Sequence, residues 1–182
     1  MQAEIITIGD EILLGQTVDT NSAWIGSELA DLGIPVYQIT SIADTADHIV
    51  SALKEAIRRS HLVFVTGGLG PTNDDITKST LADFFGTTLE IHEPTLEKIK
   101  AYFASRDREV LPTNIQQAAL PKSAKVIPND HGTAAGMWFE EDHAIVISMP
   151  GVPYEMKAMM KDTILPEVEK QFSTINLYRK TL

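Results

Sequence analysis

Residues 66–77, TGGLGPTNDDIT, place a glycine-rich turn directly before two adjacent aspartates. Glycine-rich turns after strands hold phosphate well, because a backbone without Cβ atoms can bring its N–H groups close to an anion. The carboxylates of Asp74 and Asp75 would repel the same phosphate. A Mg²⁺ ion removes this conflict, since it binds one or two carboxylates and lets substrate phosphates complete its coordination shell. The segment therefore predicts a metal-dependent phosphate site.

The backbone of the turn is expected to hold part of a phosphate or pyrophosphate through its N–H groups. The turn is neither of the common phosphate loops, because it lacks the lysine of a P-loop and has Asn73 where a dinucleotide fingerprint has its third glycine. The residues that we expect to bind phosphate here are Gly67, Gly68, Gly70 and Thr72.

The carboxylates are expected to hold the cation. Asp75, together with Asp44 or Asp74, would bind Mg²⁺ or another divalent cation such as Co²⁺, which would polarise a phosphoryl group and orient water for attack. We therefore take Asp44, Asp74 and Asp75 as candidate catalytic residues, with Asp44 and Asp75 as the metal ligands. The general base stays open between Asp44, Asp74 and Glu155.

A structural role could also explain the aspartates. Asp44 and Asp75 each stand directly before a predicted helix, where a helix N-cap contributes about 0.5–2 kcal/mol. An N-cap has no need of the three nearby glycines, however, whereas a backbone that approaches an anion needs several. The glycines therefore favour a binding site.

The elements around these residues alternate between strand and helix. Apolar runs of strand length occupy residues 3–8, 34–43 and 61–66, and amphipathic helical spacing covers residues 21–32 and 45–60. The third run is too uniformly apolar to have a solvated face, which is typical of a parallel strand covered on both sides by helices. The βαβαβ order predicts an open α/β sheet with right-handed crossovers.

The second half of the chain extends this sheet. Helices are predicted over residues 76–85, 94–105 and 153–172, and Pro166 should kink or split the last of them. Short strands are predicted at residues 124–129, 134–141 and 144–150. The last two strands are joined by a short polar segment, so they form a hairpin and make the sheet mixed.

Ligands of open α/β sheets bind beyond the carboxyl ends of the parallel strands. Glycines and carboxylates follow four of the predicted strands, so we expect them to meet at one edge of the sheet. Outside the glycine-rich turn, these strand-end residues are Gly9, Asp10, Glu11, Asp44, Gly151, Pro153 and Glu155.

Composition limits the other possibilities. A net charge of −10 argues against a nucleic-acid partner, because binding to the phosphate backbone requires a basic surface. The chain has no cysteine, no apolar run near the ~20 residues that cross a bilayer, and no signal-peptide pattern, so we expect a cytoplasmic protein without a membrane partner. We expect one domain over residues 1–172, and residues 173–182 as a tail or the start of an interdomain linker.

Five segments together resemble the N-terminal domain of CinA, the competence/damage-inducible protein family. They are TIGDEILLGQTVDTNSAWI, TGGLGPTNDDITKSTLADFFG, NIQQAALP, NDHGTAAG and MPGVPYEM. That domain belongs to the molybdopterin-binding superfamily, with the MogA-like and MoeA-like enzymes and gephyrin. The resemblance implies a three-layer α/β/α sandwich around a mostly parallel sheet, a homo-oligomer (dimer or trimer), and a second, C-terminal amidohydrolase domain that this chain does not contain.

The resemblance also implies an activity: divalent-metal-dependent hydrolysis of ADP-ribose to AMP and ribose 5-phosphate, with a monovalent cation as an optional second ion. Two alternatives remain open. One is a molybdopterin-binding, nucleotidyl-transferring protein of molybdenum cofactor assembly, and the other is a non-catalytic nucleotide-binding domain. Within these segments the residues that match the family are Asp10, Glu11, Asn21, Gly67, Gly68, Gly70, Thr72, Asp75, Gly151, Pro153 and Glu155, and outside them Asp44 matches the acidic residue after the second strand of the molybdopterin enzymes.

Overall fold

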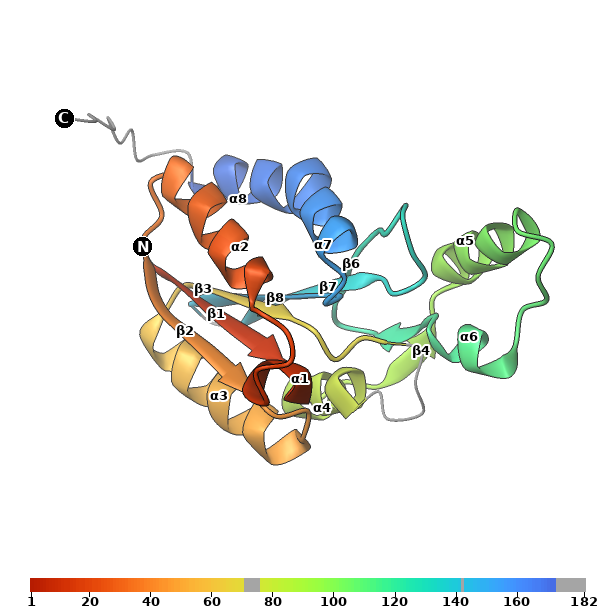
Figure 1. The fold of residues 1–182 in the computed structure, drawn as a ribbon, viewed down its shortest axis with the longest axis horizontal. Coiled ribbons are helices and arrows are strands. Elements are labelled where there is room, and N and C mark those ends of the chain that lie inside the picture. Colours follow the sequence, from red (N-terminus) through yellow and green to blue (C-terminus); the bar gives the residue numbers. More distant parts are fainter. Residues whose placement is uncertain (71–75, 142, 173–182) are drawn as a thin grey trace.

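A six-stranded mixed sheet forms the centre of the protein (Figure 1). The computed structural model describes residues 1–70, 76–141 and 143–172. The strand order is β2-β1-β3-β8-β7-β6, in which the first four strands are parallel to one another, and β7 and β6 are antiparallel to their neighbours. The strands are β1 Ala3–Ile8, β2 Val36–Ile42, β3 Leu62–Thr66, β6 Lys125–Ile127, β7 Gly136–Glu141 and β8 Ala144–Met149.

Helices cover both faces of this sheet, as the resemblance implied (Figure 1). On one face, α2 (Thr20–Asp31) and the C-terminal helices pack over the sheet, and on the other face lie α3 (Ala46–Arg59) and α4 (Ile76–Phe84). Side chains of β1 alternate between these two cores: Ile5 belongs to the first, and Ile6 belongs to the second. The predicted three-layer α/β/α fold with a mostly parallel sheet is confirmed.

The central strands are buried on both faces. Every residue of β1 and β3 is buried, which explains why their sequences show continuous apolar runs rather than alternation. One charged residue of β1, Glu4, is only 2% exposed. Its carboxylate accepts two hydrogen bonds from the Arg59 guanidinium, at 3.0 and 2.9 Å, and one at 3.0 Å from the Ser60 hydroxyl. These hydrogen bonds connect the C-terminal end of α3 to β1.

The last helical stretch is interrupted, as Pro166 predicted. It consists of α7 (Pro153–Met159), a π-helical turn (Met160–Ile164) and α8 (Leu165–Phe172). Proline has no N–H group and its ring excludes the carbonyl of residue i−4, so the normal hydrogen-bond ladder cannot continue through it. The π-helical turn precedes Pro166 and accommodates the backbone hydrogen bond that proline cannot make.

The helix predicted over residues 94–105 is observed as α5 (Glu93–Ala104), but several small elements near it were not predicted. Strands β4 (Leu89–Ile91) and β5 (Ala119–Pro121) form a separate antiparallel pair, and the short helix α6 (Pro112–Gln116) lies with α5 away from the main sheet beside them (Figure 1). A single turn, α1 (Asp10–Leu13), follows β1. Among the described residues, no helix is long and apolar enough to cross a membrane.

Candidate functional site

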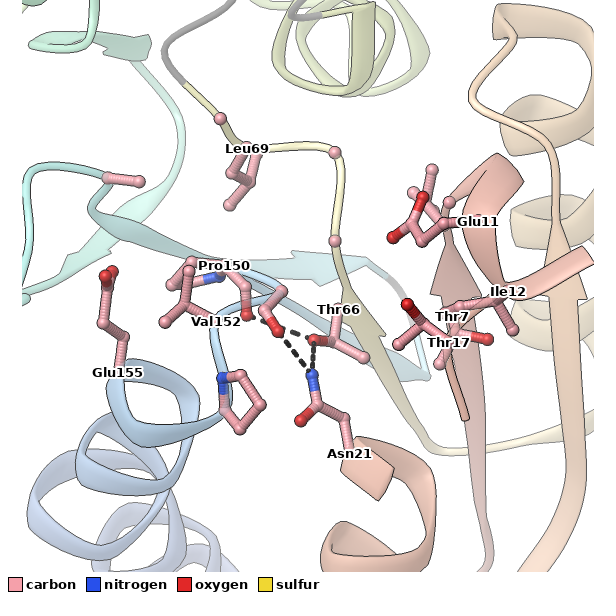
Figure 2. A pocket seen from close by; sticks show the side chains of 18 of the residues that line it. Thr7, Glu11, Ile12, Thr17, Asn21, Thr66, Leu69, Pro150, Val152 and Glu155 are labelled. Atoms are coloured by element: carbon pink, nitrogen blue, oxygen red, sulfur yellow. Dashed lines mark hydrogen bonds between the residues drawn. The ribbon is translucent and has the colours of Figure 1, made fainter. Parts of the chain in front are cut away.

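A cavity of about 520 Å³ opens at the carboxyl edge of the parallel strands (Figure 2). It is bounded by the segments that follow β1, β2, β3 and β8, so the predicted convergence of the strand ends is confirmed. Its size lies in the range of small-molecule sites. The candidate residues that line it are Gly9, Glu11, Asn21, Asp44, Gly67, Gly68, Gly70, Gly151, Pro153 and Glu155.

The glycine-rich turn packs closely against its neighbours. Gly67 has φ +104° and Gly68 has φ +67°, backbone conformations that residues with a Cβ rarely adopt. A Cβ at Gly67 would collide with the carbonyl oxygen of Ile8, and one at Gly68 with the hydroxyl of Thr77. A Cβ at Gly70 would meet no atom of the described residues within 4 Å. The described packing therefore requires glycine at the first two positions, but not at Gly70.

The N–H groups of the turn have different roles. The N–H of Gly67 donates to the carbonyl oxygen of Met149 at 3.1 Å, so it joins β3 to β8 rather than facing a ligand. Within the part of the chain that the structure describes, the N–H groups of Gly68, Leu69 and Gly70 have no backbone acceptor. Among the described residues of the turn, these three N–H groups are therefore the ones that a phosphate could bind, and the predicted Thr72 lies outside the described residues.

Asn21 links three walls of the cavity from the first turn of α2 (Figure 2). Its side-chain nitrogen donates to the Thr66 hydroxyl at 3.1 Å and to the Gly151 carbonyl at 2.9 Å, and the Thr66 hydroxyl donates to the Pro150 carbonyl at 3.1 Å. The position matched by resemblance is thus a structural connection between the end of β3 and the loop after β8. The oxygen of the Asn21 side chain is buried and has no hydrogen-bond partner in the described structure.

Asp44 and Glu155 bring carboxylates to the cavity from different elements. Asp44 follows β2, and its Oδ1 accepts a hydrogen bond of 3.4 Å from the buried Thr77 hydroxyl. Glu155, in the first turn of α7, is 8% exposed and accepts a bond of 2.6 Å from the side-chain nitrogen of Asn129. Its charge, together with burial, raises the pKa of the neighbouring Tyr154 hydroxyl.

Acidic side chains dominate the charged lining. The carboxylates of Glu11, Asp19, Asp44 and Glu155 line the cavity, and the described lining residues include no lysine, arginine or histidine. Figure 2 shows Glu11 and Glu155 on opposite sides of the view. A phosphate that enters this cavity meets carboxylates without a cationic side chain among the described residues, so a bound cation would have to balance the charge.

A complete metal site is not formed by the described residues. Across residues 1–70, 76–141 and 143–172, no three carboxylate or histidine side chains cluster closely enough to hold a metal ion. Magnesium is nevertheless commonly held by one or two carboxylates and substrate oxygens, so the donor set around Asp44 fits such an ion. The predicted ligand Asp75, together with Thr72 and Asp74, lies outside the described residues.

One expected residue is not at the cavity, and others were missed. Asp10 is exposed at the start of α1 and does not line the cavity, whereas the adjacent Glu11 does. Gln117, Thr133 and Thr66 line it and were not predicted to do so. Gln117 belongs to the NIQQAALP segment and Thr133 to NDHGTAAG, so the resemblance pointed to their segments without indicating which residue matters.

Comparisons with known proteins agree with this architecture. The model of the family described as "Probable molybdopterin binding domain" matches residues 4–170. A CinA-like protein of Cytophaga hutchinsonii is 46% identical over 180 residues, which are 99% of this chain and 43% of that protein. The chain thus spans less than half the length of this curated relative.

Solved structures show the same fold. The crystal structure of the protein CinA with unknown function from Thermoplasma acidophilum matches with a TM-score of 0.82 and 38% identity, covering 91% of this chain and 96% of that chain. The tungsten cofactor synthesizing protein MoaB from Pyrococcus furiosus matches with a TM-score of 0.60 and 20% identity, covering 93% of this chain and 95% of that chain. The second likeness concerns the fold alone.

Proposed function

Because the chain belongs to the probable molybdopterin-binding domain family, and within it to the CinA-like proteins, we propose that its cavity binds a phosphorylated nucleotide through a divalent cation. The activity that we propose is hydrolysis of ADP-ribose to AMP and ribose 5-phosphate. Water attacks one phosphorus of the pyrophosphate, the bond from that phosphorus to the bridging oxygen breaks, and each product keeps one phosphate.

The acidic lining of the cavity is the observation that carries this proposal. Backbone N–H groups from Gly68 to Gly70 supply hydrogen-bond donors for a phosphate, but the charged side chains of the described lining are all carboxylates. Such a cavity favours a phosphate ligand only when a cation accompanies it. A cavity built for an anion alone would be expected to contain arginine or lysine.

The roles of the residues follow from their positions. Asp44 would hold Mg²⁺ or Co²⁺ together with Asp75, and the bound cation would polarise the phosphoryl group. The Thr77 hydroxyl orients the Asp44 carboxylate, and the Asn129 amide orients that of Glu155. Asp44, Asp74 and Glu155 remain the candidates for the base that takes the proton of the attacking water.

A second candidate ligand is molybdopterin. The matching family is described as a probable molybdopterin binding domain, and MoaB of Pyrococcus furiosus is described as a tungsten cofactor synthesizing protein. The same glycine turn would hold the phosphate of the pterin, and the carboxylates would assist nucleotidyl transfer. A third candidate is binding of a nucleotide without turnover.

Incubation of the purified protein with ADP-ribose and Mg²⁺ or Co²⁺, with AMP followed by chromatography, tests the proposal. We expect metal-dependent AMP that disappears with EDTA and falls at least about 100-fold in Asp44→Asn and in Asp75→Asn, in line with the loss of an electrostatic group at a reaction centre. Asp47→Asn, which removes an exposed carboxylate from the first turn of α3, is the control and should retain activity.

The other outcomes separate the candidates. Nucleotide binding without AMP would support the non-catalytic domain, and molybdopterin binding without nucleotide binding would support the second candidate. Homo-oligomerisation and a partnership with an amidohydrolase domain are further proposals from the resemblance, and a cytoplasmic location is a further proposal from the composition. A monomeric mass in light scattering would contradict the first of these.

A further inference from the structure

Gln117 carries a buried side-chain amide without a hydrogen-bond partner among the described residues. The residue is 5% exposed, and both its side-chain nitrogen and its side-chain oxygen are buried and unpaired within the described structure. An unsatisfied buried polar group destabilises a protein, so most such groups are paired. Gln117 also lines the acidic cavity, although nothing in the proposed hydrolysis uses it. This side chain therefore calls for a partner that the described residues do not supply.

The backbone around Gln117 is held firmly. The N–H of Gln117 donates to the carbonyl of Asn114 at 3.2 Å, and the ammonium of the buried Lys78 donates to the Gln116 carbonyl at 2.9 Å. The next residue is fixed by its carbonyl, which accepts from the N–H of His92 at 2.8 Å. The amide therefore projects from a fixed point, whereas its terminal torsion is broad and lets it turn toward a ligand.

We infer that Gln117 selects the heterocyclic base of the ligand, by donating one hydrogen bond to its edge and accepting one from it. A side-chain amide pairs in this way with a flat ring that carries an acceptor beside a donor, as adenine does at N7 and N6. A pterin ring carries acceptor and donor groups of the same kind. The inference rests on the proposed function, because it assigns a specificity residue to the same cavity.

The position of Gln117 supports this assignment. Leu69, Gly70, Thr133 and Ala134, none of which carries a charge, line the same cavity as Gln117. The carboxylates Glu11 and Asp44 line it from the segments that follow β1 and β2. The uncharged lining residues suit a base, and the carboxylates suit the metal and the phosphates.

Binding measured by calorimetry in the presence of Mg²⁺ tests the inference. The probes are AMP, inosine monophosphate, a soluble pterin and ribose 5-phosphate, which lacks a base. The variants are Gln117→Met, which keeps the length of the side chain without its polar atoms, and Gln116→Met, which makes the same change at the exposed neighbouring residue.

We expect Gln117→Met to weaken AMP or pterin binding about 10- to 100-fold, as loss of a bidentate contact does, and to leave ribose 5-phosphate binding unchanged. The ring that the wild-type protein binds more tightly shows whether the ligand carries a purine or a pterin. If the wild type binds AMP more tightly than inosine monophosphate, this preference should disappear in the variant. Without ligand, Gln117→Met should unfold at the same or a higher temperature than the wild type, because it removes unpaired polar atoms. Gln116→Met should change none of these values.

Unchanged affinity of Gln117→Met for AMP and for the pterin would overturn the inference. An equal loss of affinity for ribose 5-phosphate would also overturn it, because it would show that the substitution damages the whole cavity. The proposed hydrolysis fails separately: a wild-type protein that binds AMP through Gln117 but releases no AMP from ADP-ribose contradicts only the hydrolysis. A wild-type protein that binds none of the probes contradicts both.

Discussion

The side-chain nitrogen of Asn21 lies 2.9 Å from the carbonyl oxygen of Gly151, and this hydrogen bond joins residues 130 positions apart in the chain. The same nitrogen also donates to the Thr66 hydroxyl. One side chain thus connects the start of α2 to the end of β3 and to the loop after β8. These two hydrogen bonds couple the positions of three segments that line the cavity.

Replacing Asn21 by alanine should therefore weaken the fold and the site together. Two hydrogen bonds are lost and the Gly151 carbonyl loses its donor, so we expect the free energy of unfolding to fall by about 1–3 kcal/mol. Urea denaturation monitored by circular dichroism measures this change.

The neighbouring Ser22 provides a matched control. Its hydroxyl is buried and has no hydrogen-bond partner among the described residues, so Ser22→Ala should leave stability unchanged or raise it slightly. Equal destabilisation by the two alanine variants would contradict the special role of the Asn21 bridge.

The glycines of the turn should differ in their tolerance of alanine. Gly67→Ala would force a left-handed conformation and a collision with the Ile8 carbonyl, so we expect a loss of about 2 kcal/mol or more in stability. Gly70→Ala meets no atom of the described residues and should stay within about 0.5 kcal/mol of the wild type. Thermal unfolding of the two variants side by side tests this, and a strongly destabilised Gly70→Ala protein would be the contrary result.

Arg59→Met should destabilise the fold by about 3 kcal/mol, because it leaves the buried Glu4 carboxylate without its countercharge. Arg58→Met is the matched control, since Arg58 pairs with Glu55 on the surface and such pairs contribute less than about 1 kcal/mol. Chemical denaturation of both variants measures the difference. Similar midpoints for the two would show that the Glu4 network contributes little.

The titration of Asp130 should depend on Lys98. A hydrogen bond of 2.6 Å from the Lys98 ammonium, with its charge, lowers the pKa of the Asp130 carboxyl. A lowered pKa in the folded state means that this pair stabilises the protein above the ordinary pKa of aspartate, and that the contribution is lost as the pH falls through the folded-state value. Lys98→Met should therefore raise the pKa of Asp130 toward its ordinary value.

Carboxyl resonances followed by NMR during an acid titration measure this pKa directly. Lys100→Met is the control, because Lys100 pairs with Glu97 on the same helix and should leave the Asp130 titration unaffected. An Asp130 pKa that does not respond to Lys98→Met would show that the ion pair is absent in solution.

Local patterns were sufficient for much of this fold. The continuous apolar runs of β1 and β3 predicted buried parallel strands, and the helical spacing of α3 placed Ile49, Leu53 and Ala56 on one buried face. Pro166 predicted the interruption of the last helix. These features depend on the side-chain periods of 2.0 and 3.6 residues and on the missing N–H of proline, all of which are readable along the chain.

The convergence of strand ends was also predictable, but the contacts at the cavity were not. Because the carboxyl ends of parallel strands share one edge, the sequence alone placed Gly9, Asp44, Gly67 and Gly151 around one cavity. It did not separate Asp10 from Glu11, which differ in orientation by about 100° in the single turn of α1. A short helical turn has too few residues to show an apolar face.

The chain by itself thus determined the layers of the fold, the edge that carries the cavity and the presence of carboxylates there. Only the tertiary structure decided that Gly67 and Gly68 are required by packing, that Asn21 joins the end of β3 to the loop after β8, and that Gln117 reaches the cavity from beside the small β4–β5 sheet. The physical reason is sequence separation. Spacing and composition report how neighbouring residues share a helix or strand, whereas these three contacts join segments that only the completed sheet brings together.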